Sequence, residues 1–401
     1  MKTSQTLAAA LLIALPAGAQ HYTVTGKFPG LKNGAEVALE VKQDGKRIDI
    51  STTKVVNGAF RLTGHVAKPT LVQLKINDKA IYGDGEYAQD RGIPILIENT
   101  PIVVMAAHFD SIPRNYEYQS TPLFKEKNVT VKGGRAQAQY DEWRKAVYDA
   151  ELQAWKSEHA LQKYQFDTPR AQKDAEQEQR LKNAAKKDAG TVAVLNRTFI
   201  EQHPTYVISL KLQRDQLENL FTYTDADYDR MLALLKDNDD QMGYANFRKT
   251  IEGLRKFTKG TLYTDFGVVT PKGQKHKLSS FLAKEKYTFI DFWASWCGPC
   301  RAAIPKIKAL HAQFGTRLRI ISISVDAKTE DWKRAMDEEK MPWIQLQAPK
   351  SSIQTLRDAY RLTAIPNLLI LDPEGHVILA TSDPDEAHSM IESLLSDQAG
   401  K

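Results

Sequence analysis

Between residues 291 and 301 the chain reads Asp291-Phe292-Trp293-Ala294-Ser295-Trp296-Cys297-Gly298-Pro299-Cys300-Arg301. The β-branched and aromatic run 288–293 predicts a strand before the cysteines, and residues 300–314 are compatible with a helix after them. Unpaired N–H groups and a partial positive charge at a helix start favour a thiolate, here that of Cys297. Cys300 lies three positions further on the same face of the first turn, close enough for a disulfide. We therefore expect Cys297 to be an exposed attacking thiol and Cys300 a partly buried resolving thiol.

These two cysteines are the only ones among 401 residues, so no disulfide framework holds the fold together. Half of a zinc site is one alternative, but no second Cys-x-x-Cys and no histidine cluster at ligand spacing accompany the pair. A static disulfide is another, although so short a loop adds little stability. Two adjacent core thiols would not require the flanking tryptophan, glycine and proline. The pattern favours a redox-active disulfide, with no metal and no further cofactor.

Composition indicates a globular protein of two or three domains, with 42% hydrophobic and 26% charged residues. Lysine and arginine number 55 against 49 acidic residues, a net charge of +6. Because no basic run carries interleaved aromatic residues, we expect no nucleic-acid partner.

Residues 1–19 are typical of a secretory signal peptide. Lys2 precedes an apolar run at 7–15, and Ala17-Gly18-Ala19 has the form of a cleavage site. The run is too short for a stable membrane anchor, and a buried N-terminal helix is the alternative. We expect cleavage near Ala19 and a periplasmic location, where an isolated cysteine pair takes part in thiol–disulfide exchange.

Residues 21–135 have the period of β-structure, for example at Val37, Leu39 and Val41. Asn57-Gly58, between short apolar runs, predicts a β-hairpin. We expect an N-terminal antiparallel β-sandwich or barrel.

Residues 136–259 change to helical periodicity and are predicted to form a helical connector. Within it, Thr168-Pro169 predicts the start of a second helix, with Thr168 as the cap. From residue 260 to 401 strands and helices alternate, which indicates an α/β layer with a mainly parallel core and a terminal hairpin.

The segment 291–301 resembles the thioredoxin active site almost residue for residue, and residues 260–401 resemble the TlpA/ResA-like thiol–disulfide oxidoreductases of the AhpC/TSA redoxin superfamily. Further motifs carry this resemblance: Thr264-Asp265-Phe266, Ser324-Val325-Asp326, Trp332, Met341-Pro342-Trp343 and Ala364-Ile365-Pro366-Asn367. A weaker resemblance links Val24-Thr25-Gly26 and residues 55–60 to the β-rich N-terminal domain of bacterial redoxins.

The resemblance implies a thioredoxin-like C-terminal domain and a role for several residues. Asp291 would be a buried carboxylate that accepts the proton of Cys300. Pro366 would follow a cis peptide bond, and Ile365 would offer its backbone to an extended substrate. Trp296, with Gly298 and Pro299, would shape the docking surface around the disulfide. One position departs from the pattern, since Ser322 replaces the lysine that thioredoxins usually place near the aspartate.

The Gly298-Pro299 dipeptide is that of thioredoxin, whose reduction potential is about −270 mV, against about −120 mV for the oxidant DsbA. That gap of ~150 mV corresponds to roughly 7 kcal/mol for two electrons, so it decides the direction of electron flow. The dipeptide favours a reductant.

The sequence therefore predicts a periplasmic reductase of protein disulfides that works through Cys297 and Cys300. Its partners would be disulfide-bearing client proteins and a membrane-borne thiol donor. For the N-terminal domain two roles stay open, selection of clients and formation of a homodimer. A thiol peroxidase is a first alternative, although Ala294 and Ile290 stand where peroxiredoxins carry threonine and proline. A non-enzymatic binding or holdase module is a second alternative.

Overall fold

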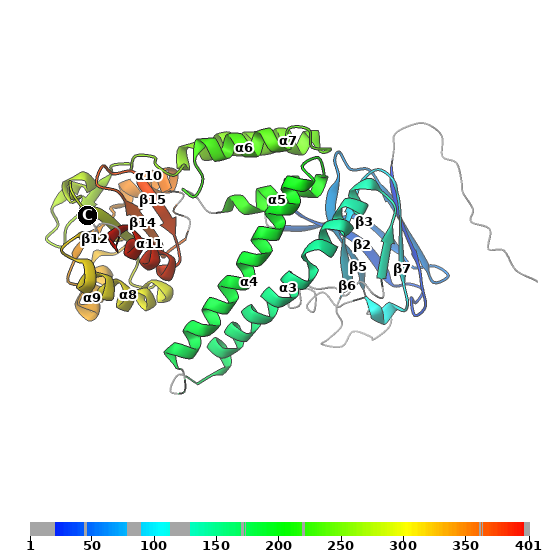
Figure 1. The fold of residues 1–401 in the computed structure, drawn as a ribbon. Coiled ribbons are helices and arrows are strands. Elements are labelled where there is room, and N and C mark those ends of the chain that lie inside the picture. Colours follow the sequence, from blue (N-terminus) through cyan, green and yellow to red (C-terminus); the bar gives the residue numbers. More distant parts are fainter. Residues whose placement is uncertain are drawn as a thin grey trace, which may run out of the picture. The chain divides into compact units, whose positions relative to one another are not determined.

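The computed structural model describes residues 21–43, 46–77, 90–112, 129–169, 172, 174–218, 221–360, 362 and 364–396. The predicted signal peptide lies outside these residues. Contacts divide the chain into two compact units, Met1–Leu212 with Asp237–Gly243, and Gln213–Lys236 with Tyr244–Lys401. Each unit has its own core, and Figure 1 shows their elements. The boundaries 21–135, 136–259 and 260–401 stay predictions from sequence. No helix in the described ranges has the length and apolar character needed to cross a bilayer.

The N-terminal region is a β-sandwich. Its strands are β1 (Tyr22–Lys27), β2 (Glu36–Gln43), β3 (Lys46–Lys54), β4 (Ala59–Gly64), β5 (Thr70–Asn77), β6 (Asp90–Ile97), β7 (Pro101–Ala106) and β8 (Val129–Lys132). They form two four-stranded sheets, in the orders β4-β1-β7-β8 and β3-β2-β5-β6. Val24 and Ile102 from one sheet share a hydrophobic cluster with Val37 and Leu74 from the other, which confirms a sandwich. The pairing is antiparallel as expected, except that β1 and β7 run parallel.

The predicted hairpin at Asn57-Gly58 is only half correct. The turn forms, with both residues at positive φ (52° and 66°) and a bridge between Val56 and Ala59. The strands on its two sides do not pair over their length, because β3 pairs with β2 in one sheet and β4 with β1 in the other. A two-residue turn determines the path of the chain locally, whereas the burial of apolar faces selects the partner strands.

Two long helices follow, α3 (Arg135–Asp167) and α4 (Ala175–Gln202), which pack side by side (Figure 1). The prediction that Thr168 caps the second helix is wrong. Thr168 ends α3 in an extended conformation, because a residue before proline avoids the helical region. Asp174 caps α4 instead, and its side chain accepts a hydrogen bond from the N–H of Glu176 at 3.0 Å. Three shorter helices come next: α5 (Val207–Asp215), α6 (Asp225–Leu235) and α7 (Gln241–Leu254).

The C-terminal region is built on a seven-stranded sheet in the order β10-β9-β13-β12-β11-β14-β15. Its strands are β9 (Gly267–Val269), β10 (Lys275–Lys277), β11 (Tyr287–Trp293), β12 (Leu318–Ser324), β13 (Ile344–Gln347), β14 (Asn367–Leu371) and β15 (Val377–Thr381). The pairs β11–β12 and β12–β13 are parallel, and β14–β15 is the expected terminal hairpin. Sequence periodicity did not reveal β9 and β10, which are three residues long and too short for a repeat to register.

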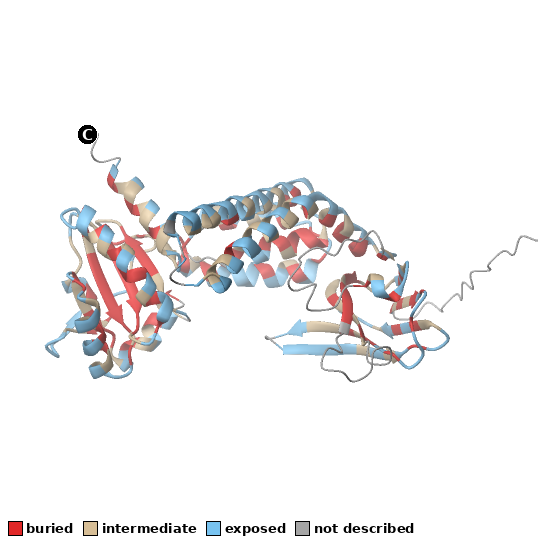
Figure 2. Cartoon of the chain, turned by 90° about the horizontal axis from the view of Figure 1, so that it is seen from below, coloured by how far each residue is buried: buried red, intermediate tan, exposed pale blue. Residues whose placement is uncertain are grey.

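Helices cover both faces of this sheet: α8 (Gly298–Phe314), α9 (Thr329–Glu339), α10 (Lys350–Tyr360) and α11 (Pro384–Ser396). On one face Phe289 and Trp293 of β11 pack in one hydrophobic cluster with residues of α8, α9 and α11. Phe292 points to the other face, where its ring lies 5.8 Å from that of Tyr360 in α10. Both faces are covered, so the central strands are buried along their length (Figure 2).

Candidate functional site

The two cysteines form a disulfide at the start of α8, directly after the loop that follows β11. Cys297 is the N-cap residue, and its Sγ accepts a hydrogen bond from the backbone N–H of Cys300 at 3.2 Å. The positive end of the helix dipole therefore points at the first sulfur and favours its thiolate after reduction. The strand–cysteines–helix arrangement expected from the sequence is confirmed.

The prediction that Cys297 is exposed is wrong for this oxidised state. Cys297 retains 4% and Cys300 2% of their accessible surface. Both belong to the hydrophobic cluster on the α8 face of the sheet, which explains the low exposure. The predicted difference between the two cysteines is confirmed only in its direction, since Cys297 is the more exposed of the two.

The residues expected to shape the docking surface lie around this pair. Trp296 is 70% exposed, and Gly298 and Pro299 are exposed beside it. On the other side the Ile365–Pro366 peptide bond is cis, and the carbonyl oxygen of Ile365 lies 3.8 Å from Sγ of Cys297. The loop before β14, more than sixty residues away in sequence, thus borders the disulfide directly.

Asp291 is buried in the middle of β11, with 2% of its surface exposed. Strand alternation places its side chain between those of Phe289 and Trp293, on the face that α8 covers. Burial raises the pKa of Asp291 to about 7, and a hydrogen bond from Ser322 opposes this shift. A carboxyl group with this pKa exchanges its proton near neutral pH.

Ser322 replaces the lysine of the thioredoxin pattern with a hydrogen-bonded chain. Its Oγ–H donates to Oδ2 of Asp291 at 3.0 Å, and its Oγ accepts from Nε1 of Trp343 at 2.9 Å. Ser322 is fully buried and Trp343 is 8% exposed. The carboxyl group therefore has a neutral polar partner in place of a charged one.

Asp326 holds the loop before the cysteines, a role that the sequence motif did not reveal. Its carboxylate accepts hydrogen bonds from the N–H and Oγ of Ser295, at 2.9 and 2.7 Å, and from Oγ of Ser324 at 2.8 Å. A signal was present in the sequence, because an aspartate follows the strand that pairs with β11.

Arg301 directly follows the second cysteine, but its guanidinium is bound elsewhere. Its Nε lies 2.7 Å from Oε1 of Glu339 and its Nη2 lies 2.8 Å from Oε2 of Glu338, both at the end of α9. These carboxylates compensate its charge, whereas the positive end of the α8 dipole lies directly at Cys297, the N-cap residue.

Family models match both ends of the chain. One described as thioredoxin-like matches residues 285–377, which include the disulfide and the cis-proline loop. The C-terminal region is a thioredoxin-like domain. A second model, described as a domain of unknown function (DUF4369), matches residues 22–140 and so coincides with the β-sandwich.

Individual relatives match the same thioredoxin-like domain. The thioredoxin-like protein YneN of Bacillus subtilis is 27% identical over 134 residues, which cover 33% of this chain and 74% of that protein. The thiol–disulfide oxidoreductase ResA of the same organism is 22% identical over 157 residues, 39% of this chain and 82% of that protein. Among solved structures, the thioredoxin domain of a thiol–disulfide oxidoreductase from Bacteroides vulgatus is 27% identical and covers 34% of this chain and 97% of its own, with a TM-score of 0.32. The family match and the two relatives support an oxidoreductase activity.

A groove of about 530 Å³ opens beside the disulfide of the thioredoxin-like domain. It is lined by Trp296, Val325, Asp326, Ala327, Ala348, Lys350, Ile353, Arg357, Leu362, Ala364 and Ile365. The sequence predicted Trp296 and Ile365 as site residues and named Val325, Asp326 and Ala364 only as parts of motifs. The α10 residues in the lining, such as Lys350 and Arg357, join the site only through the fold.

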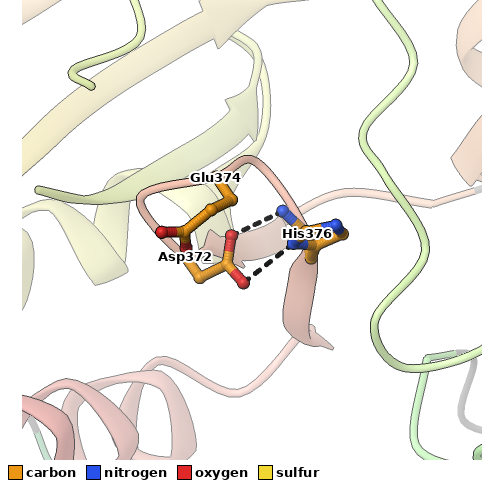
Figure 3. A group of neighbouring side chains, drawn as sticks. All are labelled: Asp372, Glu374 and His376. Atoms are coloured by element: carbon orange, nitrogen blue, oxygen red, sulfur yellow. Dashed lines mark hydrogen bonds and ion pairs between the residues drawn. The ribbon is translucent and has the colours of Figure 1, made fainter. Parts of the chain in front are cut away.

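Among the described residues, one group could offer ligand atoms to a metal: Asp372, Glu374 and His376 (Figure 3). The side chain of Asp372 accepts from the N–H of His376 at 2.7 Å and contacts its Nδ1 at 3.1 Å. These bonds close the turn between β14 and β15. β14 begins beside Phe292 and ends beside Thr288, so this turn lies at the opposite edge of the sheet from the disulfide.

Proposed function

We propose that the chain is an exported thiol–disulfide oxidoreductase that reduces disulfides in client proteins. The observation that carries the proposal is the Cys297–Cys300 disulfide at the N-terminus of α8, with the Cys300 N–H donating to Sγ of Cys297. This geometry lowers the energy of the Cys297 thiolate, which is the form that attacks a disulfide.

The reaction consists of two exchanges. The Cys297 thiolate attacks one sulfur of the client disulfide, forms a mixed disulfide and releases the other client sulfur as a thiolate. The Cys300 thiolate then attacks Sγ of Cys297, releases the second client thiolate and forms the intramolecular disulfide. Two electrons pass to the client, so a membrane-borne dithiol donor must reduce the protein again.

Asp291 is proposed to take the proton of Cys300 in the second exchange. Its raised pKa, about 7, makes it a base that can accept a proton and return it to solvent near neutral pH. Its placement on the α8 face of β11 puts it on the same side of the sheet as the buried thiol. No organic cofactor or metal enters these steps.

The periplasm is the proposed location, on the basis of residues 1–19. Client proteins and the dithiol donor are the proposed partners, and the β-sandwich is a candidate for client selection or dimerisation. The Ala294 and Ile290 positions argue against a peroxidase, because the Thr and Pro of the peroxidatic site are missing.

The experiment is to trap the first intermediate with Cys300→Ser. A reduced sample should form a mixed disulfide with a disulfide-bonded model protein through Cys297, and the adduct should persist because no resolving thiol is present. Cys297→Ser, the matched control, should form none. Wild-type protein reduced with a dithiol should reduce the same model protein catalytically. Activity retained by Cys297→Ser would favour the binding or holdase alternative, and consumption of hydroperoxide without reduction of the model protein would favour the peroxidase.

A further inference from the structure

The groove beside the disulfide is placed to contact whatever a client carries next to its cysteine. Trp296, adjacent to Cys297, forms one wall, and Ile365, whose carbonyl lies 3.8 Å from Sγ, belongs to the same lining. A client polypeptide whose cysteine reaches Cys297 can therefore place its neighbouring residues in this groove. The inference rests on the proposed reduction of client disulfides.

One face of α10 makes the groove both apolar and basic. Lys350, Ile353 and Arg357 all line it, at spacings of three and four residues that place them on the same side of the helix. Both cations are exposed, and neither makes an ion pair or hydrogen bond within the described part of the chain. Their charges are thus available to a bound molecule.

The position of Lys350 does not stabilise α10. It is the first residue of α10, where the helix dipole disfavours a cation, and no acidic residue stands in the first turn. The dipole and the ammonium group therefore add to one positive end that opens on the groove.

The one carboxylate in the lining does not cancel this field at the rim. Asp326 is 5% exposed, and its oxygens already accept three hydrogen bonds from Ser295 and Ser324. Its charge lies in the wall of the groove, whereas Lys350 and Arg357 are at the surface.

We infer that this groove binds an acidic side chain of the client polypeptide, within a few residues of the cysteine that Cys297 attacks. Apolar residues of the same segment would pack on Trp296, Ile353 and Leu362, and the client carboxylate would lie between Lys350 and Arg357. Charge complementarity of this kind selects among partners more than it raises affinity overall. The proposed reductase would then prefer clients with acidic residues beside their disulfide.

The test measures kcat/KM for disulfide-bonded peptides that differ only in one residue, glutamate or lysine, at each position within three residues of a cysteine. The proteins are the wild type, the charge-reversed Lys350→Glu/Arg357→Glu variant and a control, Lys284→Glu/Lys333→Glu. The control changes the net charge equally, at two exposed lysines that do not line the groove. Thermal unfolding checks that all three are folded.

At low ionic strength we expect the wild type and control to prefer the best glutamate peptide by about fivefold to tenfold, the scale of two exposed ion pairs. The groove variant should lose or invert this preference. Half-molar salt should reduce the wild-type preference to about twofold or less, because exposed charges are screened. This salt dependence serves as the test if the groove variant does not fold.

Equal rates for glutamate and lysine peptides, or a preference that survives in the groove variant, would overturn the inference and leave the reductase function intact. If the wild type reduces none of the peptides and no model protein, the proposed function itself fails.

Discussion

The two ends of the chain differ in how their structure relates to the sequence. In the thioredoxin-like domain, strand, cysteines and helix follow one another within 291–314, so a contiguous motif contains the reaction centre. In the β-sandwich, β1 pairs with β4 and with β7, and its register with β7 joins Val24 to Ile102. Local motifs therefore specify chemistry well, whereas pairing between distant strands depends on the burial of apolar faces.

The largest expected effect concerns the pH dependence that Asp291 gives to the C-terminal unit. The native carboxyl keeps its proton up to about pH 7, whereas the unfolded chain releases it near the ordinary pKa of an aspartate, 3.8. Between these values the native state binds more protons, so its free energy of unfolding falls as pH rises, by about 4 kcal/mol for three pH units. Asp291→Asn should abolish this fall.

Urea unfolding of oxidised wild type and Asp291→Asn at pH 4 and pH 8 measures the difference. At pH 8 the free energy of unfolding of the variant should exceed that of the wild type by about 1 to 4 kcal/mol. A variant whose stability relative to the wild type is the same at both pH values would show that Asp291 is ionised throughout, and its role as proton acceptor would fall with it.

The next prediction separates the two cores. Leu74 is 1% exposed in the cluster of the β-sandwich, and Leu74→Ala should destabilise that unit by about 3 kcal/mol, since it leaves a cavity. The rate of disulfide exchange at 25 °C should stay within about twofold, because the cluster around Cys297 and Cys300 shares no residue with that of Leu74.

The matched control is Ile48→Ala, at a residue of β3 that is 43% exposed, which should change stability by less than about 0.5 kcal/mol. Chemical denaturation and an exchange assay measure both quantities. A loss of activity in Leu74→Ala that Ile48→Ala does not share would show that disulfide exchange depends on the core of the β-sandwich. The two cores would then not be independent.

A smaller effect is expected from Ser322→Ala, which removes the hydrogen bond that favours the ionised form of Asp291. The pKa of Asp291 should rise further above about 7, by about one unit, the scale of a hydrogen bond to a charged group. The pH profile of the second exchange should shift to higher pH by the same amount. Trp343→Phe keeps an aromatic ring but removes the hydrogen bond to Ser322, and it should shift the profile less. Equal profiles for all three proteins would refute the role of these hydrogen bonds in setting the pKa of Asp291.

The smallest effect concerns the start of α4. Asp174→Ala should destabilise the N-terminal unit by about 1 kcal/mol, because its side chain caps the helix. Thr168→Ala should change stability by less than about 0.5 kcal/mol, since Thr168 ends α3 and its side chain makes no hydrogen bond to the described residues. If thermal unfolding shows Thr168→Ala to be the more destabilising of the two variants, Thr168 rather than Asp174 caps α4.

Much of the thioredoxin-like domain was predictable because each element is encoded locally. The run at 288–293 carries enough β-branched and aromatic residues to identify β11 within one residue at each end. The start of α4 was not, because Thr168-Pro169 satisfies the local pattern of a helix start and equally that of a helix end. In the structure Thr168 is extended and ends α3, and α4 begins only after its own cap, Asp174.

That one cysteine pair precedes a helix is encoded in neighbouring residues, and so is the contact of its first sulfur with the amide dipoles of that helix. The surroundings of the sulfurs depend instead on the assembled fold: their low exposure, the hydrogen bonds of Ser322 and Trp343 behind Asp291, and the basic groove formed by α10 and the cis-proline loop. These contacts join residues from different strands and helices, and no local pattern encodes a distance between elements that the packing of the whole sheet determines.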